Sequence, residues 1–171
     1  MGMTPDQFFE AFVEQNRWDC HENPGDIRRA FNAAVSASHL ADHYFTFNKR
    51  HNPALVNQFK TIGAFIEHLS SKTNGGFRDI RSISNAYKHL YTDTGTQYET
   101  HSSVNSSGSI DAIKLLDDHI DGMKEEFIEK TGDETVGLSV VFTRKDGSRV
   151  QFLPVLDSVV DYFTSIVFER E

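Results

Sequence analysis

The residues best suited to chemistry lie around one short stretch, RSISNAYKHL, which begins at Arg81. Arg81, Asn85 and His89 follow one another at intervals of four residues, and Arg78 and Ser82 share that interval. Because a helix turns by about 100° per residue, all five side chains would lie on one side of it. Arginine and asparagine bind anionic and amide groups, and histidine transfers protons near neutral pH. A simpler interpretation is the hydrated side of an amphipathic helix.

A second stretch, SASHLADHYF, carries His39 and His43 one helical turn apart. Two imidazoles at this spacing point the same way and are able to hold zinc or another transition metal. Two histidines are fewer than the three protein ligands of a catalytic zinc, so His68 or His89 would have to supply the third. The simpler alternative is that the two histidines bind no metal and are either exposed or packed against other side chains.

The two stretches together suggest a single pocket. If their helices pack with the polar edges facing, His39, Asp42, Asn85 and His89 lie close together. A carboxylate beside an imidazole raises the basicity of the ring and fixes its tautomer, as a general base requires. A buried polar contact between two helices would use the same residues. The candidate catalytic residues are therefore His89, His39 and Asp42, and both interpretations stay open.

Length and charge limit the classes of function. The 171 residues suit one domain, which at this size buries roughly 70% of its unfolded surface. The net charge of −8 disfavours long-range attraction to nucleic acid or to an anionic membrane, but leaves room for local basic patches. Cys20 is the only cysteine, which excludes an internal disulfide. With no secretory signal and no apolar run of about 20 residues, we expect a cytoplasmic protein that spans no membrane.

Helical patterns fill the first half of the chain. Thr4-Pro5-Asp6-Gln7 is typical of a helix start, and Asn23-Pro24-Gly25 of a turn. Asp26 is suited to cap a second helix, and Asn52-Pro53 to open a third. Asn74-Gly75-Gly76 should end that third helix. The expected helices lie at about 4–22, 26–49, 52–74 and 78–91.

The second half of the chain is more mixed. Residues 92–109 are rich in serine, threonine and glycine, and we expect a loop-like insertion. Apolar residues at helical spacing from Ile110 to Phe127 predict a fifth helix. Residues 136–153 predict a β-hairpin around Asp146-Gly147, which should lie on the helices or gain a partner strand. The expected fold is a single, mainly α domain over residues 1–171. It is a bundle of five to six helices with a C-terminal β-hairpin before the last helix.

The order of these motifs resembles a group of uncharacterised bacterial proteins. In that group a His-x-x-Asp segment precedes an Asn-Ala-aromatic-Lys-His segment. The matching residues here are His39, Asp42, Asn85, Ala86, Tyr87, Lys88 and His89. The resemblance covers about residues 29–91 and the late hairpin, and it implies no activity.

The helical layout also resembles, more distantly, the HEPN superfamily (higher eukaryotes and prokaryotes nucleotide-binding). Active members of that superfamily are metal-independent ribonucleases, in which an Arg and a His separated by four to six residues face each other across a dimer. Here Arg81 and His89 have seven residues between them, so no catalytic assignment follows from the resemblance. A HEPN domain that acts only as a partner or dimerisation module would tolerate this departure.

Three functions stay open, and we favour a non-catalytic, homodimeric helical module without a cofactor. It would bind a protein or a small ligand through polar residues of the fourth helix. The candidate binding residues are Arg78, Arg81, Asn85 and Lys88. The first alternative is a HEPN-like ribonuclease or other nucleotide-acting enzyme that uses His89 and a nearby arginine, and only in this case is RNA a partner. The second alternative is a metal-binding bundle at His39 and His43.

Overall fold

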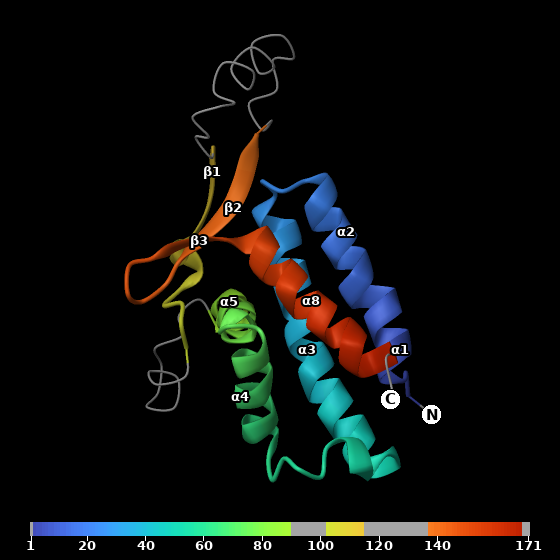
Figure 1. Ribbon diagram of the computed structural model, residues 1–171. Helices are drawn as coiled ribbons and strands as arrows, with labels where there is room; N and C mark the ends of the chain where they lie inside the picture. The colour runs from blue at the N-terminus through green and yellow to red at the C-terminus, as the bar shows by residue number, and fades with distance from the viewer. Residues whose placement is uncertain (1, 90–101, 115–136, 169–171) are drawn as a thin grey trace.

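The computed structural model describes residues 2–89, 102–114 and 137–168 (Figure 1). Within these residues the protein is mainly helical. It has five helices, counting the continuous helical run from Pro5 to Glu22 as one, and a three-stranded antiparallel sheet before the last helix. The predicted fold class is confirmed. No helix in this part of the chain is long and apolar enough to cross a lipid bilayer.

The first two helices begin where the sequence predicts. α1 (Pro5–Phe8), the π-helical turn η1 (Phe9–Val13) and α2 (Glu14–Glu22) follow one another without a break. The side chain of Gln7 accepts a hydrogen bond from the backbone N–H of Thr4 at 3.0 Å. α3 (Ile27–His51) starts after Asp26, whose carboxylate accepts hydrogen bonds from the backbone N–H groups of Arg28 and Arg29.

The third predicted helix begins later than expected, and this part of the prediction is wrong. Pro53–Leu55 forms only a 3₁₀ turn, η2, and α4 (Ile62–Lys72) starts after Thr61. Thr61 Oγ1 accepts a hydrogen bond from the backbone N–H of Ala64 at 3.2 Å and so caps the helix. α4 ends at Lys72, directly before the predicted stop, where Asn74 and Gly75 have positive φ angles of 50° and 85°.

The sheet contains one strand that the sequence pattern did not predict. β2 (Leu138–Thr143) and β3 (Arg149–Gln151) form the predicted hairpin, in which Gly147 has a φ of 85°. β1 (Ile110–Lys114) pairs antiparallel with β2, so that Ile110 lies opposite Phe142. The helix predicted from Ile110 is therefore wrong over these five residues, because the hairpin gains the partner strand that it needs.

Parts of four predictions lie outside the described residues. These are the remainder of the expected fifth helix, residues 115–127, the first part of the loop-like insertion, residues 92–101, the end of the expected fourth helix, residues 90–91, and the first residue of the hairpin range, residue 136. The described end of that insertion contains a short 3₁₀ turn, η3 (Ser107–Ser109).

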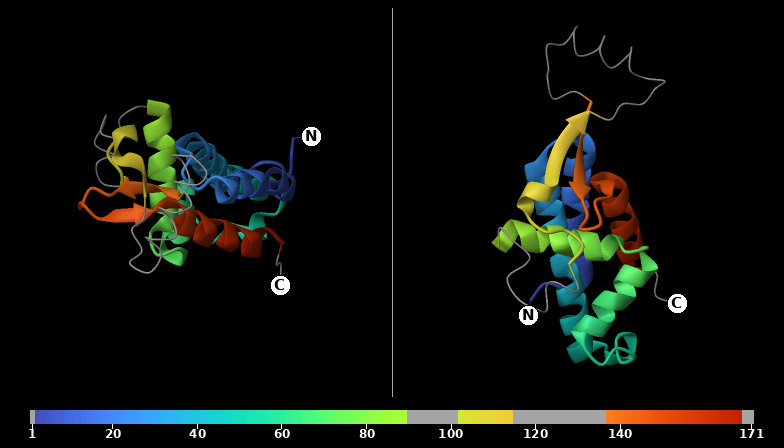
Figure 2. Two further views of the ribbon diagram at one scale, coloured as in Figure 1. Left: turned by 90° about the horizontal axis from the view of Figure 1, so that it is seen from above. Right: turned by 90° about the vertical axis from the view of Figure 1, so that its left-hand side faces the viewer.

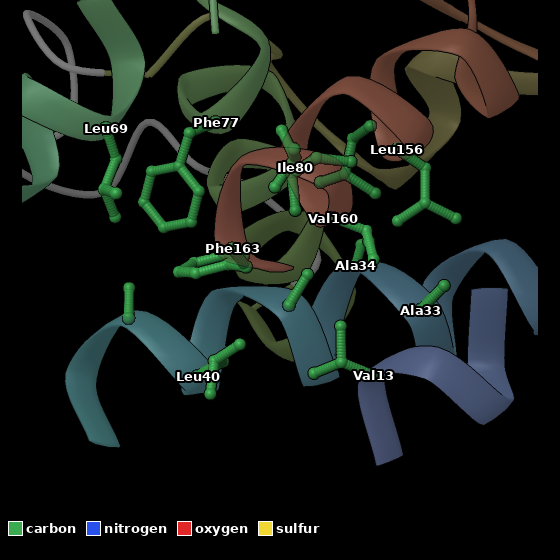
Figure 3. Close-up of a cluster of buried hydrophobic side chains, with 14 of the residues drawn as sticks. Val13, Ala33, Ala34, Leu40, Leu69, Phe77, Ile80, Leu156, Val160 and Phe163 are labelled. Carbon is green, nitrogen blue, oxygen red and sulfur yellow. The ribbon is translucent and has the colours of Figure 1, made fainter. Parts of the chain in front are cut away.

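The core lies where α5 (Gly76–His89) and the last helix, α8 (Phe152–Phe168), meet α3. α5 crosses α3 instead of running along it (Figure 2). Apolar side chains from α3, α4, α5 and α8 fill the space between them (Figure 3). Phe77 of α5 meets Phe163 of α8 edge to face, with 5.8 Å between ring centroids. This packing fixes which side of α5 faces away from the core.

Candidate functional site

The polar side of α5 lines a groove of about 470 Å³ between α5 and α4. α5 contributes four polar side chains, Arg78, Arg81, Ser82 and Asn85, and α4 contributes an apolar wall of Ile62 and Ile66. The remaining residues of the lining are Gly63, Glu67, Ser70 and Ser102. The size of the groove lies within the range of small-molecule sites in proteins, about 300–1,000 Å³. Three of the four predicted binding residues, Arg78, Arg81 and Asn85, thus share one groove.

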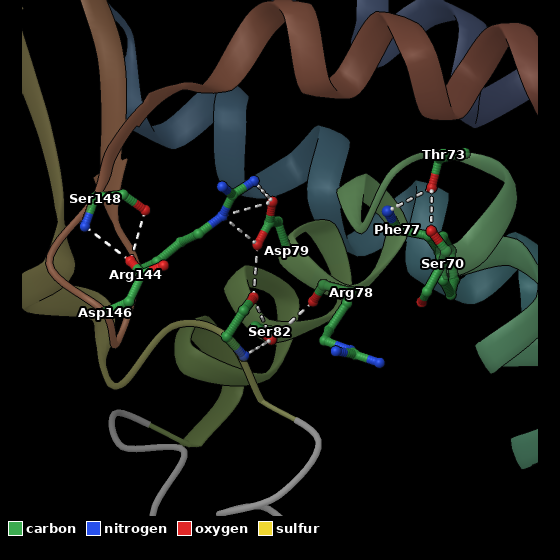
Figure 4. A network of polar contacts seen from close by, with 10 residues as sticks. Ser70, Thr73, Phe77, Arg78, Asp79, Ser82, Arg144, Asp146 and Ser148 are labelled. Carbon is green, nitrogen blue, oxygen red and sulfur yellow. Dashed lines mark hydrogen bonds and ion pairs between the residues drawn. The ribbon is translucent and has the colours of Figure 1, made fainter.

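The amphipathic pattern of α5 explains this placement. Phe77, Ile80 and Ile83 are almost fully buried, so the opposite side of the helix must carry the polar residues. Thr73 fixes the start of α5, because its hydroxyl accepts a hydrogen bond from the backbone N–H of Phe77 at 2.9 Å (Figure 4).

Among the described residues, one carboxylate holds each arginine of the groove. Arg78 Nη2 lies 2.9 Å from Glu67 Oε2, and Arg81 Nη1 lies 3.2 Å from Asp42 Oδ2. A guanidinium group has five N–H donors. Each arginine therefore uses one nitrogen for positioning and keeps further donors for a ligand.

The other polar groups of the groove differ in how many hydrogen bonds they already make within the protein. Ser82 Oγ donates to the carbonyl of Arg78 at 2.7 Å and accepts from the backbone N–H of Ser103 at 2.9 Å. Ser70 Oγ donates to the carbonyl of Ile66 at 3.0 Å. The half-buried amide of Asn85 has no hydrogen-bond partner among the described residues. Among the described residues, Asn85 is therefore the neutral polar side chain of this groove whose hydrogen-bond donors and acceptor are available to a ligand.

An ion pair that the sequence did not reveal, between the buried Asp79 and the partly exposed Arg144, holds α5 against the hairpin. Asp79 is only 1% exposed, and Arg144 binds its carboxylate through Nε at 3.1 Å and Nη2 at 2.6 Å. Ser103 Oγ donates to the same carboxylate at 2.7 Å (Figure 4). The side chains of Arg78 and Asp79 leave α5 in different directions, one toward the groove and one toward the hairpin. The only signal in the sequence was an aspartate within the apolar pattern of α5.

The predicted contact between the two polar stretches is present, but with other partners. Asp42 meets Arg81, and His39 Nε2 lies 2.8 Å from Lys88 Nζ. Since the ammonium group of Lys88 donates only, Nε2 of His39 accepts. Burial lowers the pKa of His39, and the nearby charge of Lys88 lowers it further. Asp42 raises this pKa, as the sequence suggested, but the sum of the effects is a lowered pKa.

His39 does not line the same hollow as Asn85. It lies in a separate hollow of about 350 Å³, where Phe8, Phe12 and Tyr87 supply aromatic walls. His89 is the last residue of α5, and its side chain lies outside the described residues. The pocket predicted from His39, Asp42, Asn85 and His89 thus stays a prediction where it depends on His89.

His43 has structural contacts in this fold. Its Nε2 lies 2.7 Å from the carbonyl oxygen of Met3, and its ring stacks on Phe8 with 5.3 Å between centroids. Over the described ranges, no group of three or more His, Cys, Asp or Glu side chains is placed to hold a metal ion. The geometry thus gives no support to a metal site at His39 and His43 within those ranges.

No family model, no curated protein and no solved structure matches this chain. The geometry of the groove is therefore the main basis for a functional proposal.

Proposed function

We propose that the protein is a binding module that takes a small anionic ligand with an apolar part in the groove between α4 and α5. The observation that supports this proposal is the composition of one groove of ligand size. Among the described residues, it combines two arginines with spare donors, an amide without a hydrogen-bond partner, and an aliphatic wall.

The anionic group of the ligand would lie against Arg78 and Arg81. Arginine recognises carboxylate and phosphate groups through two parallel N–H donors, which gives both affinity and orientation. Glu67 and Asp42 hold the two guanidinium groups in place before the ligand arrives. Such preorganisation lowers the entropy cost of binding.

The rest of the ligand would contact the other two features of the groove. Ile62 and Ile66 offer aliphatic surface to an apolar part, and Asn85 offers both a donor and an acceptor. Small-ligand sites usually combine a largely apolar lining with a few polar groups that fix orientation.

Binding is favoured over catalysis because of the side chains in this lining. The one carboxylate among the described lining residues is Glu67, which is paired with Arg78. The nucleotide-acting alternative depends on His89, so it has no geometric support in the described part of the chain.

Isothermal titration with hexyl phosphate tests the proposal, since this probe combines one phosphate with an alkyl chain. We expect measurable binding to the wild-type protein at low ionic strength. Arg81→Gln should weaken binding about tenfold, equivalent to about 1.4 kcal/mol. Asn85→Ala should weaken it less, because a neutral hydrogen bond contributes about 1 kcal/mol.

Arg28→Gln is the matched control, because Arg28 is exposed, pairs with one carboxylate and lies outside the groove. It removes the same charge and should leave the affinity unchanged. Absence of binding to the wild-type protein, or an equal loss in Arg28→Gln and Arg81→Gln, would contradict the proposed function.

A further inference from the structure

A second and wider hollow adjoins the groove. Its volume is about 740 Å³, and it lies where the C-terminal half of α3 faces the start of α4. Ile62 lines both the groove and this hollow. The hollow carries three cationic side chains, Lys49, Arg50 and Lys60, and we call it the basic hollow.

In the described part of the chain, no neighbouring carboxylate forms an ion pair with the cations of the basic hollow. Lys49, Arg50 and Lys60 are exposed and have no ion-pair partner among the described residues. Lys49 Nζ instead lies over the ring of Phe45, 5.5 Å from its centroid. Among the described lining residues the one carboxylate is Asp42, which is already paired with Arg81. A protein with a net charge of −8 thus gathers in one place three positive charges that no carboxylate of the described residues pairs with.

The Arg81–Asp42 ion pair connects the two hollows. Arg81 lines the groove, Asp42 lines the basic hollow, and their charged atoms are 3.2 Å apart. A ligand whose anionic group binds Arg81 therefore has the basic hollow next to it. Its chain needs only to pass Ile62, which borders both spaces.

We propose that the ligand is an elongated small molecule with two phosphate groups, one at Arg78 and Arg81 and the other in the basic hollow. This inference rests on the proposed function and adds a second subsite to it. Lysine and arginine side chains are the usual partners of phosphate groups. The hydroxyl groups of Thr46 and Thr61 also line the basic hollow and are hydrogen-bond donors for phosphate oxygens.

The test compares two probes that differ by one phosphate, hexyl phosphate and hexanediol bisphosphate, by isothermal titration at low ionic strength. The wild-type protein should bind the bisphosphate at least about tenfold more tightly, equivalent to about 1.4 kcal/mol. The double variant Arg50→Gln with Lys60→Gln should lose this difference and keep its affinity for hexyl phosphate. Neither residue lines the groove itself.

The matched control is Lys114→Gln with Arg149→Gln, which removes two exposed cations from the sheet. It should keep the tenfold difference. A difference that falls equally in both double variants, or that persists in Arg50→Gln with Lys60→Gln, would overturn the second subsite.

The results separate this inference from the proposed function. Hexyl phosphate binding that depends on Arg81, without any gain from the second phosphate, would overturn the second subsite alone. Absence of hexyl phosphate binding would overturn the proposed function and this inference with it.

Discussion

Asp42 and Arg81 form the ion pair that most affects the proposed binding of an anion in the groove. The carboxylate accepts hydrogen bonds from Arg81 Nη1 at 3.2 and 3.5 Å. Both side chains are partly exposed, so the pair contributes little to stability. Its effect is on binding, because Asp42 both orients Arg81 and competes with an incoming anion for it.

Asp42→Asn should therefore strengthen the binding of hexyl phosphate, by roughly threefold to tenfold, because it removes a competing negative charge. Titration calorimetry on the wild-type and variant proteins measures the change. An enzyme that uses Asp42 to assist His39 would instead lose activity in this variant. Unchanged or weaker phosphate binding would show that Asp42 does not compete for Arg81.

After burial, the charge of Lys88 is the next largest cause of the lowered pKa of His39. Lys88→Met removes the cation next to His39 Nε2, so the pKa of His39 should rise toward its ordinary value of 6.5. Titration of the histidine ring protons by NMR follows this change. Lys72→Met is a reciprocal control, since Lys72 lowers the pKa of His68 and not that of His39. A His39 pKa that moves equally in both variants would exclude a specific effect of Lys88.

Acid should destabilise the fold partly through His39 and His68. Burial is the main reason why the pKa values of both His39 and His68 are lowered. The unfolded chain then binds more protons than the folded one at a pH near and below 6.5, so stability falls as pH falls. The free energy of unfolding in urea should decrease across this window. Replacing His39 and His68 with glutamine should flatten the decrease, and an unaltered slope would contradict this origin.

At the scale of the elements, the position of α5 depends on the buried Asp79–Arg144 contact. Arg144→Gln should lower the free energy of unfolding by about 3 kcal/mol, because it leaves a buried carboxylate without its cation. Urea unfolding measures the loss. Arg28→Gln breaks an exposed pair and should cost less than about 1 kcal/mol. Equal losses in the two variants would mean that Asp79 is better hydrated than its 1% exposure indicates.

The turn between α2 and α3 meets the sheet at Gly25. A Cβ atom on Gly25 would lie 2.6 Å from Cβ of Leu138, and the carbonyl of Pro24 accepts a hydrogen bond from the N–H of Val140 at 2.7 Å. Gly25→Ala should therefore destabilise the protein by about 1–3 kcal/mol through overpacking. Gly63→Ala, with 3.6 Å to the nearest atom, should be neutral or stabilising in urea unfolding. Equal stability of Gly25→Ala and the wild-type protein would contradict this close contact.

The sequence predicted α5 and its polar side well, because strong local signals agreed. The glycine pair marks the start of the helix. Ile80 and Ile83 alternate with Arg78, Arg81 and Asn85 at helical spacing. The start of α4 was missed because apolar residues continue the helical spacing upstream of the cap Thr61. β1 was missed for another reason. Five residues fit a strand or a helix equally well, and pairing with a distant hairpin decided between them.

At the scale of the whole molecule, what the sequence could not predict is which elements face each other. The polar side of α5 was identifiable, but not that α4 would supply the opposite wall of its groove. The basic hollow likewise forms only because Lys60, Thr61 and Ile62, which follow α3 in the chain, lie beside the C-terminal half of that helix. Such sites depend on long-range packing and not on local spacing.

The distribution of charge is also a property of the whole molecule. A chain with a net charge of −8 would repel anions at long range, so a site for an anion needs locally gathered cations. That need is met by Arg78 and Arg81 in the groove and by the three cations of the basic hollow.

The likeness to HEPN proteins and the homodimer remain predictions.

Backbone amide chemical shifts in NMR, followed on the full chain during titration with hexyl phosphate, show directly where the ligand binds. The largest changes should occur at the groove, at Ile62, Gly63, Arg81 and Asn85. Shifts confined to other surfaces, such as the region of Arg28, or no shifts at saturating probe, would contradict binding in the groove.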